Sequence, residues 1–237
     1  MNVNLLFGKR EEEAQMFNES WPWKRELGEC ANQLRAAGQM THWESLDVAD
    51  SEDSYEAETE AVFEVERALM VGSFALRRLL GMPYKVTKQI RKSTVEVTAY
   101  PLRADRSAPD FLDAISAFDW YDLTRPARGQ ITTAQMCNLF VHSHVLHFAW
   151  DLAGISVEEA SILQEDDPRL SGPVTLGGFY VATDTSSRTH LTRVELDTVA
   201  DSFEAMAQDN VVALSLRRDA RGRRHLLDAS GEPRILG

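Results

Sequence analysis

The sequence has few of the features that mark membrane-spanning, secreted or disulfide-bonded proteins. Only Cys30 and Cys137 occur among 237 residues, and Cys137 lies in an apolar segment, so a disulfide framework is not expected. No apolar run approaches the roughly 18 residues that span a bilayer, which excludes a transmembrane protein. The first residues place an apolar run before their charges, the reverse of a secretory signal, and a cytoplasmic protein is therefore expected.

Basic residues are also scarce, since 25 of them stand against 37 acidic residues. Acidic and basic side chains are segregated into alternating blocks along the chain. Residues 1–66 and 107–209 each hold 5 basic and 16 acidic side chains. Residues 67–106 hold 9 basic and 2 acidic side chains, and residues 210–237 hold 6 and 3. This acidic balance disfavours duplex DNA as a partner, because phosphate contacts depend on Lys and Arg.

The two basic blocks are candidates for a local anion-binding patch. Two interpretations remain open: the basic side chains bind nucleic acid, or they neutralise the acidic blocks and solvate a hairpin. The first block contributes Lys85, Lys88, Arg91 and Lys92, and the candidate nucleic-acid-binding residues of the second are Arg217, Arg218, Arg221, Arg223 and Arg224.

Apolar periodicity predicts helices in the first third of the chain. Residues 23–37 have helical spacing, and a long helix is predicted from Tyr55 to about Leu80, where Gly81 and Pro83 end it. The long helix has two apolar stripes, which predicts burial from two sides and favours a homodimer. The second stripe consists of Phe63, Met70 and Phe74.

Further along, strands and helices are predicted to follow one another. Residues 93–102 alternate as a strand does, and residues 132–152 are predicted to form a central core helix with His142 buried and hydrogen-bonded. The remaining predictions are a hairpin of 177–184 with 188–196, a helix at 197–209, and a second hairpin of 211–219 with 223–228.

The predicted core helix carries half of the histidines, namely His142, His144 and His147. On a regular helix His144 is rotated from His142 by about 200°, and His147 by about 140°. The three imidazoles therefore cannot converge on one ion. Neither a metal nor a cofactor is expected.

Asn138 and His142 lie one turn apart, so they share a face of that helix. The order of Cys137, Asn138, three residues and His142 resembles the motif of HEPN domains, helical bundles that often dimerise and in many members cleave RNA. The long preceding helix, with Glu66, Arg67, Arg77 and Arg78, is similar to the helix beside the motif helix in such bundles. The resemblance covers about residues 55–155.

The resemblance implies a site in which a His moves a proton at the ribose 2′-hydroxyl while an Arg neutralises phosphate charge. Cys137 stands where the family places that Arg, so Arg77 or Arg78 would have to supply the charge. Asn138, His142, Arg77 and Arg78 are accordingly the candidate catalytic residues. Alternatively, His142 is a buried structural imidazole.

Together these observations predict an α+β protein: a HEPN-like helical bundle with a small C-terminal antiparallel sheet. The expected division is an N-terminal helix and acidic connection at 1–54, the bundle at 55–165 and the sheet segment at 166–237. The expected function is binding or assembly in an RNA-linked stress or defence context, with RNA or a protein as partner and no efficient nuclease activity. A metal-independent ribonuclease using His142 and a purely structural docking subunit are the alternatives.

Overall fold

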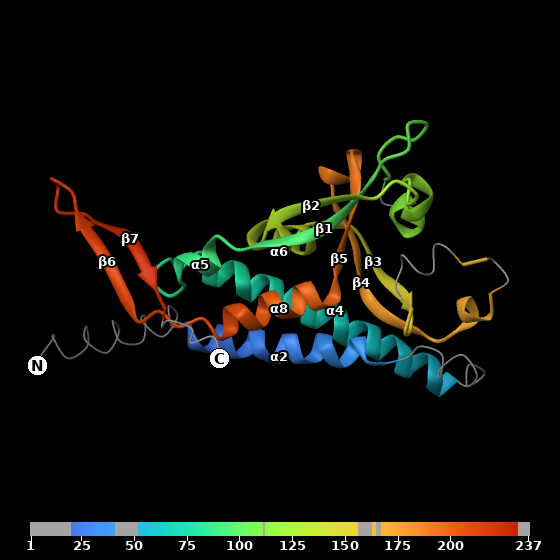
Figure 1. Ribbon diagram of the computed structural model, residues 1–237, viewed down its shortest axis with the longest axis horizontal. Coiled ribbons are helices and arrows are strands. Elements are labelled where there is room, and N and C mark those ends of the chain that lie inside the picture. The colour runs from blue at the N-terminus through green and yellow to red at the C-terminus, as the bar shows by residue number, and fades with distance from the viewer. Residues whose placement is uncertain (1–19, 41–51, 111, 156–162, 165–166, 232–237) are drawn as a thin grey trace, which may run out of the picture.

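The body of the molecule combines helices with an antiparallel sheet (Figure 1). The computed structural model describes residues 20–40, 52–110, 112–155, 163–164 and 167–231. Helices α2 (Trp21–Gly38) and α4 (Glu52–Leu80) confirm two of the predicted helices, and α8 (Leu196–Ala207) confirms a third. The predicted acidic connection lies partly outside the described residues. No helix of the described part is long and apolar enough to cross a membrane.

Five strands form the main sheet in the order β2-β1-β5-β4-β3, with every neighbouring pair antiparallel. Strand β1 (Thr94–Pro101) and the hairpin of β4 (Val174–Thr183) with β5 (His190–Glu195) confirm the predicted strands. The two edges are β2 (Ala127–Thr132) and β3 (Ser143–Leu152).

The predicted helical bundle with a small C-terminal sheet is therefore wrong. Three strands of the five-stranded sheet, β1, β2 and β3, come from the segment that was expected to be the bundle. They pair with β4 and β5 of the following segment, so that both segments build one sheet.

The error arises in the predicted core helix. The chain forms α6 (Thr133–Val141) and then changes to β3, with His142 as the residue that caps the helix. Apolar residues of β3 lie on both of its faces, with Val145 and Ala149 on one and Leu146 and Phe148 on the other. A short segment that is apolar on both faces has no period that separates strand from helix, and pairing with β4 decides it.

One face of the sheet packs against the helices and carries the main core. Fully buried Phe179 and Val194 of the sheet meet Leu69 and Leu76 of α4 and Phe203 of α8 in this core. The opposite face is partly covered by the 3₁₀ segment η1 (Asp113–Trp120), next to which Tyr121 is fully buried.

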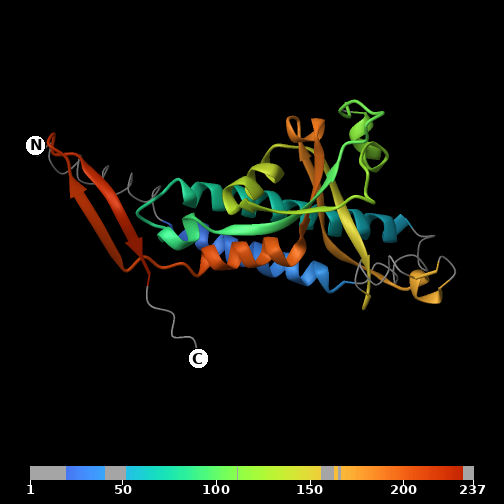
Figure 2. The same ribbon diagram turned by 45° about the horizontal axis from the view of Figure 1, so that its top comes forward.

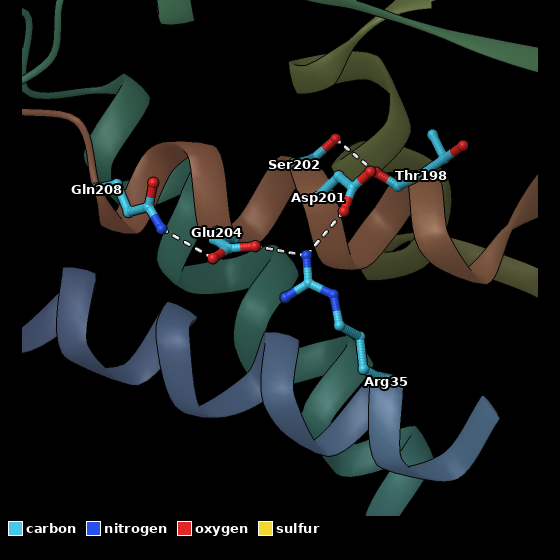
Figure 3. Close-up of polar contacts among 6 residues, drawn as sticks. All are labelled: Arg35, Thr198, Asp201, Ser202, Glu204 and Gln208. Carbon is cyan, nitrogen blue, oxygen red and sulfur yellow. Dashed lines mark hydrogen bonds and ion pairs between the residues drawn. The ribbon is translucent and has the colours of Figure 1, made fainter. Parts of the chain in front are cut away.

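Helices α2 and α8 lie side by side and are joined by charge as well as by packing (Figure 3). The Arg35 guanidinium donates to Asp201 at 2.7 Å and to Glu204 at 2.5 Å. These two carboxylates raise the pKa of Arg35, with the hydrogen bond that Arg35 donates to Asp201 as the largest cause.

The second predicted hairpin is confirmed by β6 (Ala213–Arg218) and β7 (Arg224–Ser230), which form a separate two-stranded sheet. Both ribbon views show this hairpin, called the arm below, extending away from the body (Figures 1 and 2). Every residue of β6 is exposed. The short connectors complete the described elements: α5 (Lys88–Arg91), η2 (Pro168–Ser171) and η3 (Ser186–Arg188).

Candidate nucleic-acid interface

The tip of the arm carries the five candidate arginines. Strand pairing places Arg218 directly opposite Arg224 and Arg217 opposite His225, while Arg221 and Arg223 lie in the turn between the strands. All five arginines are exposed, and none forms an ion pair with a described residue. Like charges directly across a strand pair destabilise it by a few tenths to about 1 kcal/mol, so the pair Arg218 and Arg224 favours an anion between them.

The turn of the arm is organised by the carboxylate of Asp219. It accepts hydrogen bonds from the backbone N–H groups of Arg221 at 2.8 Å and Arg223 at 2.9 Å, and it lies 3.0 Å from Nε2 of His225. These contacts lower the pKa of Asp219, with His225 as the largest cause. Gly222 closes the turn with a φ of 76°, a left-handed conformation that favours glycine.

The first basic block lies at the base of the arm. Helix α5 contacts β7, and Nζ of Lys88 is 3.8 Å from Oδ1 of Asp228. The tertiary structure thus places α5 beside the base of the arm, at one end of the molecule, as both ribbon views show (Figures 1 and 2).

The buried residue Asp209 links the base of the arm to α2 and α5 by hydrogen bonds. Asp209 accepts from the backbone N–H of Thr87 at 2.8 Å and from its hydroxyl at 2.7 Å, and Lys24 donates to the backbone carbonyl of Asp209. The start of α2, the start of α5 and the base of the arm therefore meet at one point. Burial lowers the pKa of Lys24, and Asp209 partly offsets this effect.

The residues of the HEPN-like motif lie elsewhere, where α6 packs on α4. His142 is exposed, which corrects the prediction that it is largely buried. Its Nε2 lies 3.2 Å from Nη1 of Arg77, and because a guanidinium only donates, this nitrogen accepts. An arginine therefore stands beside His142. Asn138 is exposed one turn earlier, and its backbone carbonyl accepts from the N–H of His142 at 3.1 Å.

Cys137 cannot take over the role of the absent motif arginine. Its side chain is fully buried against α4, and burial raises the pKa of the thiol to about 12. The thiol is thus neutral at physiological pH and faces the core. Arg78, the other candidate, is exposed and has no hydrogen bond to His142.

The other two histidines of the cluster hold loops in place. His147 donates to the carbonyl of Ala114 at 2.8 Å, and His144 donates to that of Pro109 at 3.2 Å. Within the described residues, no group of three or more His, Cys, Asp or Glu side chains is arranged to hold a metal ion.

Sequence reasoning missed a buried arginine on the outer face of the sheet. The guanidinium of Arg193 donates to Asp151 at 2.5 Å and to Glu195 at 2.9 and 3.1 Å, and its carbon lies 5.6 Å from the centre of the Tyr180 ring. The local sequence carries one signal of this position. Leu191, Arg193 and Glu195 stand at every second position of a strand, so they lie on the same face of it. The contact with Asp151, 42 residues away, has no signal in the local sequence.

An open cavity of about 520 Å³ adjoins Arg193. Charges of both signs line it, so it selects no class of ligand by charge alone. Its charged side chains are Glu96, Arg128, Arg193 and Glu195.

No protein-family model matches the chain, and no curated protein or solved structure is significantly similar to it. The HEPN resemblance therefore stays a prediction based on one short motif.

Proposed function

We propose that this protein binds RNA through the arm and the basic helix α5, as a binding or assembly protein without efficient nuclease activity. The observation that carries the proposal is the exposed, directly opposed pair of Arg218 and Arg224 at the tip of a projecting ribbon. Three further arginines without ion-pair partners in the described chain surround this pair. A phosphate group between opposed guanidinium groups relieves their repulsion and accepts their hydrogen bonds.

RNA fits this surface better than duplex DNA does. The arm and α5 add a basic cluster to a chain whose net charge is −12, so a long rigid duplex would also meet a molecule with an excess of acidic residues beyond the arm. A loop or single strand of RNA contacts a small surface and leaves the rest of the molecule untouched. Arginine-rich ribbons supply such contacts through phosphates and through stacking of the guanidinium plane on bases.

Binding to a fluorescein-labelled RNA hairpin, measured by fluorescence anisotropy across a range of salt concentrations, tests the proposal. Each lost phosphate contact lowers the slope of log affinity against log salt by about 0.7 to 0.9. We expect the double variant Arg218→Ala, Arg224→Ala to weaken binding by about tenfold or more and to lower the slope by about 1.5.

A matched control removes the same charge from another part of the molecule. Arg125 and Arg188 are exposed and lie outside the arm. We expect Arg125→Ala with Arg188→Ala to bind RNA as the wild type does. Equal losses in both double variants would show that binding follows net charge alone, and no binding by the wild type would leave the structural docking subunit as the better interpretation.

A metal-independent ribonuclease is the second candidate, and the 3.2 Å contact of Arg77 with His142 favours it. The pair combines an imidazole for proton transfer with a fixed positive charge for the phosphate. Against strong activity, the imidazole nitrogen that faces Arg77 is engaged in accepting its hydrogen bond, and Cys137 supplies no charge.

Incubation with mixed single-stranded and structured RNA separates the two candidates. We expect no cleavage above the level of a His142→Ala protein. Robust cleavage that disappears in both His142→Ala and Arg77→Ala, with the RNA affinity of each unchanged, would establish the ribonuclease instead.

A further inference from the structure

Helix α4 presents a long face that the described part of the chain covers only in part: the ring of Trp23 on α2 packs edge-on against Phe74, with 5.8 Å between the ring centres, and both Phe63 and Phe74 stay more than half exposed. Phe63 is 53% exposed and Phe74 is 55% exposed, with Met70 half-buried between them. Because these residues follow one another at steps of seven and four, they lie on one line along the helix. This is the second apolar stripe of the sequence, and the prediction that it is buried is wrong for the single chain.

The charges beside this stripe are separated along the helix. Glu60 lies one turn before Phe63, and Arg78 lies one turn after Phe74. Both side chains are exposed, and within the described chain neither has an ion-pair partner. Glu64, by contrast, already accepts from Arg67 at 2.6 Å. The exposed face therefore has a free carboxylate at one end, a free guanidinium at the other and aromatic rings between them.

We propose that a second copy of this chain docks on this face, with the two α4 helices antiparallel about a twofold axis. The midpoint of residues 63 and 74 is 68.5, and the midpoint of residues 60 and 78 is 69. The two midpoints differ by half a residue, about 0.8 Å along a helix. One axis therefore places Phe63 beside the partner's Phe74 and Glu60 beside the partner's Arg78.

The angular positions agree with the same arrangement. At 100° per residue, Phe63 and Phe74 point within about 20° of each other, and Glu60 and Arg78 point in the same direction around α4. In an antiparallel pair, residues on the same side of the interface meet. The dimer thus contains two aromatic contacts and two ion pairs, because a twofold interface uses the same patch on both subunits.

Charge also decides between the two possible directions. A parallel pair would place Glu60 against the partner's Glu60 and Arg78 against the partner's Arg78, which is repulsive at both ends. A different protein would need a base, two aromatic rings and an acid at the same spacing but in the opposite order. A second copy of this chain, running antiparallel, presents this arrangement. Dimerisation through α4 is independent of the proposed RNA binding and can be measured without RNA.

The mass in solution is the first test, measured by sedimentation at micromolar concentration. We expect twice the chain mass for the wild type and a dissociation constant at least about tenfold weaker for Phe63→Ser, since each dimer loses two buried rings. Leu112, which is 72% exposed, provides the control, and Leu112→Ser should sediment as the wild type does. A wild-type monomer, or a Phe63→Ser dimer as tight as the wild type, overturns the proposal.

A charge exchange tests the ion pair without touching the rings. Glu60→Arg and Arg78→Glu should each weaken the dimer, whereas the double variant should restore it, because the same pair is rebuilt in the opposite sense. Far-UV circular dichroism spectra that match the wild type in all three proteins show that the fold is intact. Additive weakening in the double variant would contradict the pairing of residues 60 and 78.

Cross-linking tests the register. The native cysteines are buried, so they do not compete with cysteines introduced at exposed positions. A mixture of Phe63→Cys and Phe74→Cys chains should form a disulfide-linked heterodimer on oxidation. Phe63→Cys alone should not cross-link, because its two Cα atoms would be about 16 Å apart, against the roughly 7 Å that a disulfide permits. The opposite pattern overturns the antiparallel arrangement.

Discussion

At the scale of single residues, Arg193 shows how a charge is accommodated in the sheet. Its side chain is 6% exposed, and it lies between the carboxylates of Asp151, 22% exposed, and Glu195, 50% exposed. Gly177 makes this arrangement possible, because a Cβ atom there would lie 1.8 Å from a carboxylate oxygen of Asp151. The carboxylates and the Tyr180 hydroxyl raise the pKa of Arg193 despite its burial, so the guanidinium stays charged.

Replacing Arg193 leaves these carboxylates without their counter-charge. We expect Arg193→Met to lower the free energy of unfolding by about 2 kcal/mol, less than for a fully buried pair because Glu195 is half exposed. Adding Asp151→Leu should recover part of the loss. Urea denaturation measures both changes, and exposed Arg188→Met is the control. A single variant as stable as the wild type would show that the cluster contributes nothing to folding.

At the scale of elements, the packing of α4 against α8 depends on the absence of a side chain. A Cβ atom on Gly72 would lie 2.1 Å from a ring carbon of Phe203, which is fully buried. The glycine therefore allows the Phe203 ring to lie against the backbone of α4. In a helix interior glycine costs about 1 kcal/mol of stability relative to alanine. The close packing of Phe203 therefore explains Gly72, whereas helix propensity does not.

We expect Gly72→Ala to destabilise the protein by about 2 kcal/mol, because overpacking outweighs the gain in helix propensity. Phe203→Leu should reduce the penalty of Gly72→Ala when the two are combined. Gly129→Ala serves as the control, since a Cβ there meets no described atom within 4 Å. Thermal or urea unfolding measures the stability of each variant. A Gly72→Ala protein more stable than the wild type would show that the Phe203 ring moves aside without an energetic cost.

At the scale of the whole molecule, polar groups that ionise at alkaline pH are built into the core. Burial raises the pKa of Cys30 to about 11 and that of Cys137 to about 12, from an ordinary 9.0. It also raises the pKa values of Tyr100 and Tyr121 to about 12, from 10.0. The Tyr121 hydroxyl keeps its proton in a hydrogen bond to the carbonyl of Ser187 at 3.0 Å.

These shifts predict a loss of stability at alkaline pH. Above about pH 9 the unfolded chain releases protons that the folded chain retains, so the free energy of unfolding falls as pH rises toward 11 to 12. Urea denaturation at pH 8, 9 and 10 measures this decrease in the free energy of unfolding. Cys30→Ala with Cys137→Ala should flatten the part of the fall that begins near pH 9, and an unchanged slope in this variant would assign the effect to the tyrosines.

The sequence by itself determined the elements whose signals are local. Helix α2, the end of α4 at Gly81, strand β1, both hairpins and α8 follow from apolar period, turn residues and helix-ending residues within a few positions. The arginines at the tip of the arm were also visible as a cluster between two alternating runs.

Only the tertiary structure decided which elements pair and which residues meet. Residues 143–152 became a strand because β4 offered hydrogen bonds to them, and this pairing replaced the predicted bundle with a five-stranded sheet. Contacts between distant residues likewise brought Arg77 to His142, Arg193 to Asp151 and α5 to the arm. Such contacts depend on the summed packing of the whole chain, which no local period encodes.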